Sequence, residues 1–153
     1  MLLVDTKYFG IMTCEEESVF DFPLGLPGFE DETRFVFIEI AEHAPLVFLQ
    51  SLNNSSLCFL ALPVPVIDPH YDLSLSAEDC AALELPLGCD PKSEGSLVLA
   101  LVSLHDGFSA TANLMAPVVV NVRRRRALQS IRVDRVYSHQ HPVPAAQYSE
   151  GVC

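Results

Sequence analysis

Basic residues are scarce in this sequence of 153 residues, which has nine lysines and arginines against 20 aspartates and glutamates. The formal net charge is therefore −11. Because nucleic-acid affinity comes largely from cationic side chains that displace counterions, this balance argues against direct binding of DNA or RNA. The acidic surplus either attracts a basic protein partner or serves solubility, and charge alone does not separate the two.

The chain also opens without a long apolar run, since Asp5 and Lys7 interrupt its first segment. A secretory signal needs an uninterrupted apolar stretch, and a membrane span needs a longer one. The five cysteines are odd in number and form no C-x-x-C pair, as expected of reduced thiols rather than of a disulfide framework. The sequence thus predicts a cytoplasmic protein that does not bind membranes.

Recognised catalytic and phosphate-binding motifs are missing as well. The motif G-x-S-x-G does not occur, and Gly25-x-x-Gly28 lacks the third glycine, the lysine and the following helix of a phosphate loop. His139-x-His141, with Cys153 as a distant third ligand, has metal-binding character. It falls short of a recognised ligand set, so two solvated histidines explain it better. We expect no catalytic residue, no metal and no cofactor.

Short apolar runs dominate what the sequence does contain. Half of the residues are hydrophobic and the length suits one domain, so a single packed core is expected. The runs are separated by Pro, Gly, Asn and Asp, which predicts roughly eight to ten strands with tight connections. The clearest are residues 18–22, 35–40, 47–52, 57–62, 97–104, 110–115, 118–122 and 128–133.

Two of these runs indicate how the strands are arranged. Phe35–Ile38 and Leu97–Val102 are apolar at every position, so both of their faces must be covered. A sheet that curls on itself meets this requirement better than a flat, one-sided sheet. The predicted fold class is mainly β, a small closed or partly open antiparallel barrel-like domain.

One short helix is predicted at about residues 77–85. Ser76 can cap it, acidic residues occupy its positively polarised first turn, and Pro86 with Gly88 ends it. After His141 the sequence has no periodicity and little to bury. We therefore expect a single domain over residues 1–141 and a flexible tail over residues 142–153.

The segment Phe20–Asp31 predicts a shaped loop that leaves a strand. Pro23 and Pro27 fix φ, while Gly25 and Gly28 permit backbone conformations that are closed to other residues. These four residues are therefore assigned a structural role.

Arg123–Arg126 is a block of like charge between two predicted strands of an acidic chain. Runs of like charge usually lie exposed, so a solvated hairpin turn or an internal match for the acidic loops explains it. A grip on an acidic segment of another molecule is the third interpretation.

Several strings occur along the chain in one order and at separations that match a known pattern. They are F-P-L-G-L-P-G-F-E-D at residues 22–31, L-Q-S-L at 49–52, D-P-x-Y at 68–71, L-S-x-E-D at 75–79, T-A-N-L-M-A-P-V-V-V-N at 111–121 and R-x-x-Q at 126–129. On these strings the chain, from about Val19 to His141, resembles the FliW family of flagellar assembly factors. The arginine block is longer than the family pattern, and the C-terminal segment is rich in Pro and Ala.

The resemblance implies a small β-barrel-like domain with a short helix, and a function in protein binding rather than catalysis. FliW proteins bind flagellin in the cytosol and bind CsrA, an RNA-binding repressor of flagellin translation. Flagellin occupies FliW until secretion depletes it, and FliW then captures CsrA and relieves the repression. The alternatives are an acidic flagellin chaperone that does not bind the regulator, and a small-ligand-binding or metal-dependent barrel enzyme that uses His139 and His141.

The candidate partner-binding residues within the matched strings are polar or amphipathic, with one apolar neighbour. Asn113 and Asn121 either cap turns through side-chain hydrogen bonds or present amides to a partner's backbone. Tyr71 combines an apolar ring with a polar tip, which is favoured at interfaces. The full candidate set is Gln50, Tyr71, Asn113, Leu114, Asn121 and Gln129.

Overall fold

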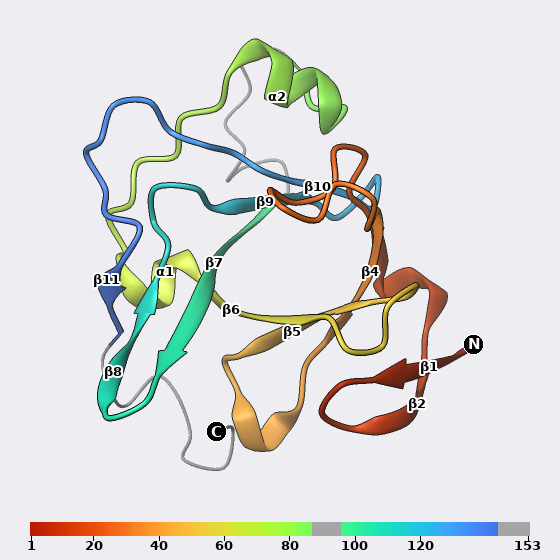
Figure 1. The fold of residues 1–153 in the computed structure, drawn as a ribbon. Helices are drawn as coiled ribbons and strands as arrows, with labels where there is room; N and C mark the ends of the chain where they lie inside the picture. The colour runs from red at the N-terminus through yellow and green to blue at the C-terminus, as the bar shows by residue number, and fades with distance from the viewer. Residues whose placement is uncertain (87–95, 144–153) are drawn as a thin grey trace.

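The computed structural model describes residues 1–86 and 96–143, and its central feature is a β-barrel (Figure 1). The barrel strands are β3 (Val19–Asp21), β4 (Arg34–Ile38), β5 (Val47–Ser51), β6 (Cys58–Pro63), β7 (Ser96–His105), β9 (Val118–Asn121) and β10 (Arg126–Gln129). They pair in the order β7-β6-β5-β4-β3-β10-β9, and β9 pairs back with β7. The sheet therefore closes, and the predicted mainly β barrel is confirmed. Neighbouring strands are antiparallel except β10 and β3, which are parallel.

Strand β7 belongs both to the barrel and to an extension of it. Its residues Ser96–Leu99 pair with β9, and Leu99–Val102 pair with β6 on the other edge. From Val102 onward, β8 (Phe108–Ala112) takes the place of β9 as its neighbour. Strand β8 in turn pairs with the short strand β11 (His141–Pro142). The barrel closure and the extension are thus parts of one continuous strand.

The interior of the barrel is filled by apolar side chains, to which every barrel strand contributes. Large members are Phe20 of β3, Phe35 of β4, Leu49 of β5 and Leu99 of β7. The next residues along these strands point to the opposite face, where Val36 and Phe48 belong to a second cluster. This alternation explains the runs that are apolar at every position, because both faces of the sheet are buried.

Several elements cover the outside of the barrel. A hairpin of β1 (Leu2–Thr6) and β2 (Gly10–Cys14) places Val4 and Cys14 in the second cluster, and α1 (Val64–Ile67) adds Val64. Helix α2 (Ala77–Ala82) packs Cys80 against the outer face of β9 and β10. Figure 1 shows α2 at the top of the view over these two strands, and the β1–β2 hairpin at the lower right. Two 3₁₀ turns, η1 (Glu16–Ser18) and η2 (Ala41–His43), complete the described elements.

The predicted loop after β3 closes part of the barrel, since Phe22 and Leu26 project into its interior. The N–H of Phe29 donates to the Leu26 carbonyl at 2.7 Å across a turn with Pro27 and Gly28 at its centre, and Gly28 has φ +86°. Proline followed by a residue of positive φ is the pattern of a type II turn.

Gly25 stands where no side chain fits. Its φ is +62°, and a Cβ at this position would lie 2.5 Å from the Cα of Glu30. The N–H of Gly25 donates to the Phe22 carbonyl at 2.8 Å, across a turn that contains Pro23.

The elements differ from the sequence-based expectations at three places. Helix α2 ends at Ala82 rather than near residue 85, because Glu84 takes a left-handed conformation with φ +59°. The last predicted strand, residues 128–133, is shifted to Arg126–Gln129, so the arginine block reaches into β10. The β1–β2 hairpin and α1 were not predicted.

The flexible tail was predicted over residues 142–153, of which residues 144–153 lie outside the described part of the chain. Pro142 pairs with Thr111 and Val143 is buried, so the described part of the fold includes both.

Candidate interaction surface

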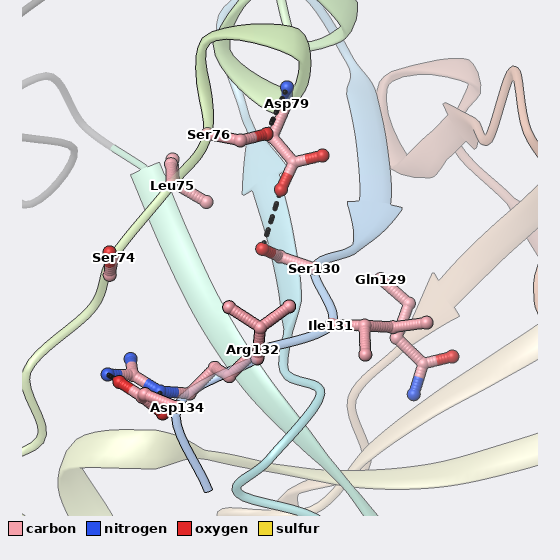
Figure 2. Close-up of a pocket in the computed structure, with 10 residues that line it drawn as sticks. Ser74, Leu75, Ser76, Asp79, Gln129, Ser130, Ile131, Arg132 and Asp134 are labelled. Carbon is pink, nitrogen blue, oxygen red and sulfur yellow. Dashed lines mark hydrogen bonds and ion pairs between the residues drawn. The ribbon is translucent and has the colours of Figure 1, made fainter. Parts of the chain in front are cut away.

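A groove of about 390 Å³ lies between the start of α2 and the segment that follows β10 (Figure 2). One wall is the connection that leads into the helix, with Ser74 and Leu75. The other wall is the extended segment Gln129–Asp134. Among the described hollows, this one combines polar groups with neighbouring exposed apolar side chains, so it is the candidate binding surface.

Two hydrogen bonds fix the helix end of the groove, both drawn in Figure 2. Ser76 caps α2, as predicted, because its Oγ accepts from the backbone N–H of Asp79 at 3.0 Å. The Oγ of Ser130 donates to Oδ2 of Asp79 at 2.7 Å. The first turn of the helix is thereby tied to the strand segment, and the groove has a preformed wall.

Arg132 anchors the other end of the groove. Its Nε and Nη2 donate to the two carboxylate oxygens of Asp134 at 3.1 and 2.6 Å, and its Nη1 donates to the Asp72 carbonyl. The guanidinium carbon also lies 5.6 Å from the ring centre of Tyr71 and 4.9 Å from that of Tyr137. A guanidinium that makes two hydrogen bonds to one carboxylate and also contacts aromatic rings holds its segment in one conformation.

These contacts shift the pKa values of the groups involved. The hydrogen bonds from Arg132, with help from the backbone N–H of Val136, hold the pKa of the Asp134 carboxyl below its usual value. Burial raises the pKa of the Tyr71 hydroxyl, which donates to the Leu114 carbonyl at 2.6 Å. The Arg132–Asp134 pair is therefore charged at neutral pH, and Tyr71 stays protonated.

Three apolar side chains project into solvent on this segment and just after it. Ile131 is 57% exposed, Val133 is 95% exposed and Val136 is 68% exposed. The usual pattern is inverted here, because the charged Arg132 is buried while its apolar neighbours face water. Apolar side chains held in water on a fixed segment are typical of protein-binding surfaces.

The predicted binding residues lie mostly inside the molecule. Gln50 is fully buried, where its Oε1 accepts from the backbone N–H of Lys7 at 2.9 Å and its Nε2 donates to carbonyls of the β5–β6 connection. Asn121 is also buried, and its Nδ2 donates to the Leu83 carbonyl at 2.7 Å. Neither side chain lines the groove: Gln50 bonds to the β1–β2 hairpin, and Asn121 bonds to the C-terminal end of α2.

The other four predicted residues gather around residues 113–117. The Oδ1 of Asn113 accepts from the backbone N–H groups of Met115 and Ala116, so it caps that turn. Leu114 is fully buried and accepts the Tyr71 hydroxyl. Gln129 donates to the Ala116 carbonyl at 3.0 Å, and it is the predicted residue that lines the groove. Partner binding by the six residues stays a prediction.

Sequence reasoning missed Ile131, Arg132, Val133 and Asp134. The sequence analysis placed residues 128–133 in a strand and assigned them no role in binding. The signal that could have shown the opposite is the contact of the guanidinium with two aromatic residues, Tyr71 and Tyr137, and sequence separation hides that contact.

The described residues contain no group of three or more His, Cys, Asp or Glu side chains that could hold a metal ion. His139 is exposed and His141 is half-buried, and Cys153 lies outside the described part of the chain. No helix within residues 1–86 and 96–143 has the length and apolar character needed to cross a bilayer.

The fold and the groove together define a small closed-barrel protein with a filled interior and a preformed groove on its outer surface. The model of the family described as FliW protein matches residues 3–143. The chain therefore belongs to the FliW family of flagellar assembly factors.

Relatives and a solved structure agree with this assignment. The chain is 30% identical over 143 residues to the flagellar assembly factor FliW of Bacillus subtilis strain 168, covering 93% of this chain and 96% of that protein. It is 34% identical to the FliW of Bacillus licheniformis, with the same coverage. A crystal structure of the flagellar assembly factor FliW superposes with a TM-score of 0.80 at 28% identity, covering 93% of this chain and 97% of that one.

Proposed function

We propose that this flagellar assembly factor binds flagellin and the translational repressor CsrA in the cytoplasm, and that exchange between these partners relieves repression of flagellin synthesis. The observation that carries the proposal is the match to the FliW family over residues 3–143. In this proposal the protein acts as a binding partner and catalyses no reaction.

The geometry supports a role in protein binding. Apolar side chains from all of the barrel strands pack its interior, so the described residues fill the space that a substrate chamber would need. The outer groove instead offers Ile131 and Val133 to a partner, on a segment that Arg132 holds in place. A preformed surface avoids the entropic cost of ordering a loop on binding.

The net charge of −11 supports the choice of a basic partner. A repressor that grips RNA must present cationic surface, and an acidic protein bound beside that surface repels phosphate groups. The same charge opposes direct contact between this protein and RNA.

Competition between the two partners tests the proposal. Purified flagellin and purified CsrA are each titrated against the protein by calorimetry, and then CsrA is titrated against the preformed flagellin complex. We expect both to bind and flagellin to weaken the apparent affinity for CsrA. Binding of flagellin alone would select the chaperone function, and binding of neither would refute the proposal.

A matched pair of variants tests the groove. Ile131→Glu places a charge on the exposed apolar segment, while Ile11→Glu makes the same change at a 73% exposed position of the β1–β2 hairpin. We expect Ile131→Glu to weaken binding of at least one partner by about tenfold and Ile11→Glu to leave both affinities unchanged. Equal effects of the two variants would show that the groove is not the binding surface.

A further inference from the structure

The turn between β9 and β10 concentrates positive charge in an acidic protein. Four of the nine lysines and arginines stand at Arg123–Arg126. Arg34 lines the same hollow of about 330 Å³ as Arg124 and Arg125, together with the carboxylates of Glu16 and Asp21. The first interpretation from the sequence, a hairpin turn exposed to solvent, agrees with this position.

The backbone of this turn is held in place on two sides. Asn121 accepts the N–H of Arg124 at 3.3 Å through Oδ1 and donates to the Leu83 carbonyl through Nδ2, which joins the turn to the end of α2. On the other side, the Arg125 carbonyl accepts the N–H of Asp21 at 2.9 Å, which joins the turn to β3. The arginines therefore project from a fixed base.

Two of the four arginines stabilise the fold. Nη1 of Arg125 donates to the Glu16 carbonyl at 2.9 Å, and Nε of Arg126 donates to the Ala82 carbonyl at 2.8 Å. Arg126 also lies 3.9 Å from a carboxylate oxygen of Glu84. These contacts give Arg125 and Arg126 a structural reason.

Arg123 and Arg124 make no comparable stabilising contact: within the described residues, neither side chain forms an ion pair or a hydrogen bond. Among the described residues, the nearby acidic run Glu15–Glu17 forms no ion pair with either of them, and Asp21 pairs with Arg34 at 3.6 Å. Glycine, asparagine and aspartate suit the centre of a tight turn, whereas adjacent like charges destabilise it. The local fold therefore does not account for these two residues.

We propose that the β9–β10 turn is a docking site for a short acidic segment of a protein partner, with Arg123 and Arg124 as the residues that bind its carboxylates. Guanidinium groups bind carboxylates through two parallel hydrogen bonds, which suits this pair. The half-buried Leu2 lines the adjoining hollow and offers apolar contact to a neighbouring side chain of the segment.

The whole-molecule charge limits what can dock. A long polyanion such as RNA meets the field of a protein with net charge −11, and two unpaired arginines replace few counterions. A short acidic segment on a partner of otherwise neutral or basic surface avoids that repulsion. The acidic body then attracts such a partner while the turn fixes its orientation.

Titration with a fluorescent peptide that carries two adjacent glutamates between neutral residues tests the site. We expect the peptide to bind, to shift the backbone amide NMR signals of residues 121–127, and to dissociate as salt is added. Arg123→Gln with Arg124→Gln lowers the net charge by the same amount as Lys7→Glu, an exposed position in the β1–β2 connection. We expect about tenfold weaker binding in the double variant and unchanged binding in Lys7→Glu.

Four outcomes would overturn the proposal. Equal weakening in both variants would mean that net charge alone acts, and absence of peptide binding would remove the site. Tighter binding of a single-stranded RNA oligonucleotide than of the peptide would assign the turn to nucleic acid. A self-association that the double variant abolishes, seen by sedimentation, would assign it to the acidic loops of a second copy. None of these measurements requires flagellin or CsrA, so the result is independent of the proposed function.

Discussion

At the scale of single residues, two glycines of one short loop have different surroundings. The sequence alone indicates that Gly25 and Gly28 occupy turns, because both stand near prolines. It does not show that the backbone of Glu30 lies against Gly25, since that approach depends on how the whole loop enters the barrel. The two glycines therefore differ in a way that only the folded chain reveals.

Gly25→Ala is expected to destabilise the protein more than Gly28→Ala. Both positions have positive φ, which costs an alanine about 1 kcal/mol, but a Cβ at residue 28 meets open space. At residue 25 the Cβ would also collide with backbone, so the loss should exceed about 2 kcal/mol. Urea denaturation followed by circular dichroism measures both values, and equal losses would contradict the packing argument.

The Arg132–Asp134 pair makes stability depend on pH at the acidic end. The pKa of Asp134 is lower in the folded chain than its ordinary value of 3.8, so the folded state binds fewer protons than the unfolded state. The contribution of the pair is complete above that ordinary value and is lost as pH falls through the lowered pKa. Stability should therefore decline over that range.

Asp134→Asn isolates this contribution. The difference in unfolding free energy between the unmodified protein and the variant should be constant from neutral pH down to about pH 5, and should shrink below about pH 4. Thermal melts across this range, in buffers of equal ionic strength, measure it. A difference that persists unchanged to about pH 2 would show that the carboxylate charge does not matter.

At the scale of elements, the strands were more readily predicted than the small helices. Strands such as β4 and β5 can be predicted from local sequence, since runs of Val, Phe, Leu and Ile favour a strand that is buried on both faces. Helix α1 covers only Val64–Ile67 and contains a proline, so it has no helical period to detect. The β1–β2 hairpin was missed because Asp5 and Lys7 interrupt its apolar pattern.

The candidate surface was less predictable than the fold. Asn121 and Gln129 were selected as polar residues of a matched string, and both bond to backbone atoms far away in sequence, such as the Leu83 carbonyl. Sequence shows that a polar group is present but not whether its partner belongs to the same chain. The exposed valine and isoleucine residues after β10 were not predicted as surface residues, because apolar side chains are expected to be buried.

The contact between α2 and the barrel should be measurable as a coupling. Ser130→Ala and Asp79→Ala each remove one side of the 2.7 Å hydrogen bond, and the double variant removes both. We expect a coupling energy of about 1 kcal/mol, because a charged acceptor strengthens the bond while partial exposure weakens it. Chemical denaturation of the four proteins gives this value, and strictly additive losses would show that the bond does not stabilise the helix.

At the scale of the whole molecule, the acidic surplus acts over distances that no single contact covers. If the proposed complex with CsrA forms, its association rate should fall as salt rises from about 50 to 300 mM, while its dissociation rate changes little. Stopped-flow fluorescence separates the two rates. The effect on RNA should follow the same dependence, so an RNA release that is insensitive to salt would exclude an electrostatic mechanism.

The closure of the barrel has a consequence for how the chain is made. Asp21 of β3 pairs with Arg126 of β10, and the last strand of the closed sheet ends at Gln129. A ribosome delivers residues in order, so the early strands leave the exit tunnel long before the strands that complete the ring. During that interval the large side chains of β3, β4 and β5 lack their interior neighbours. Synthesis of this protein therefore exposes a half-built sheet, which nascent-chain chaperones are suited to shield until β9 and β10 have emerged.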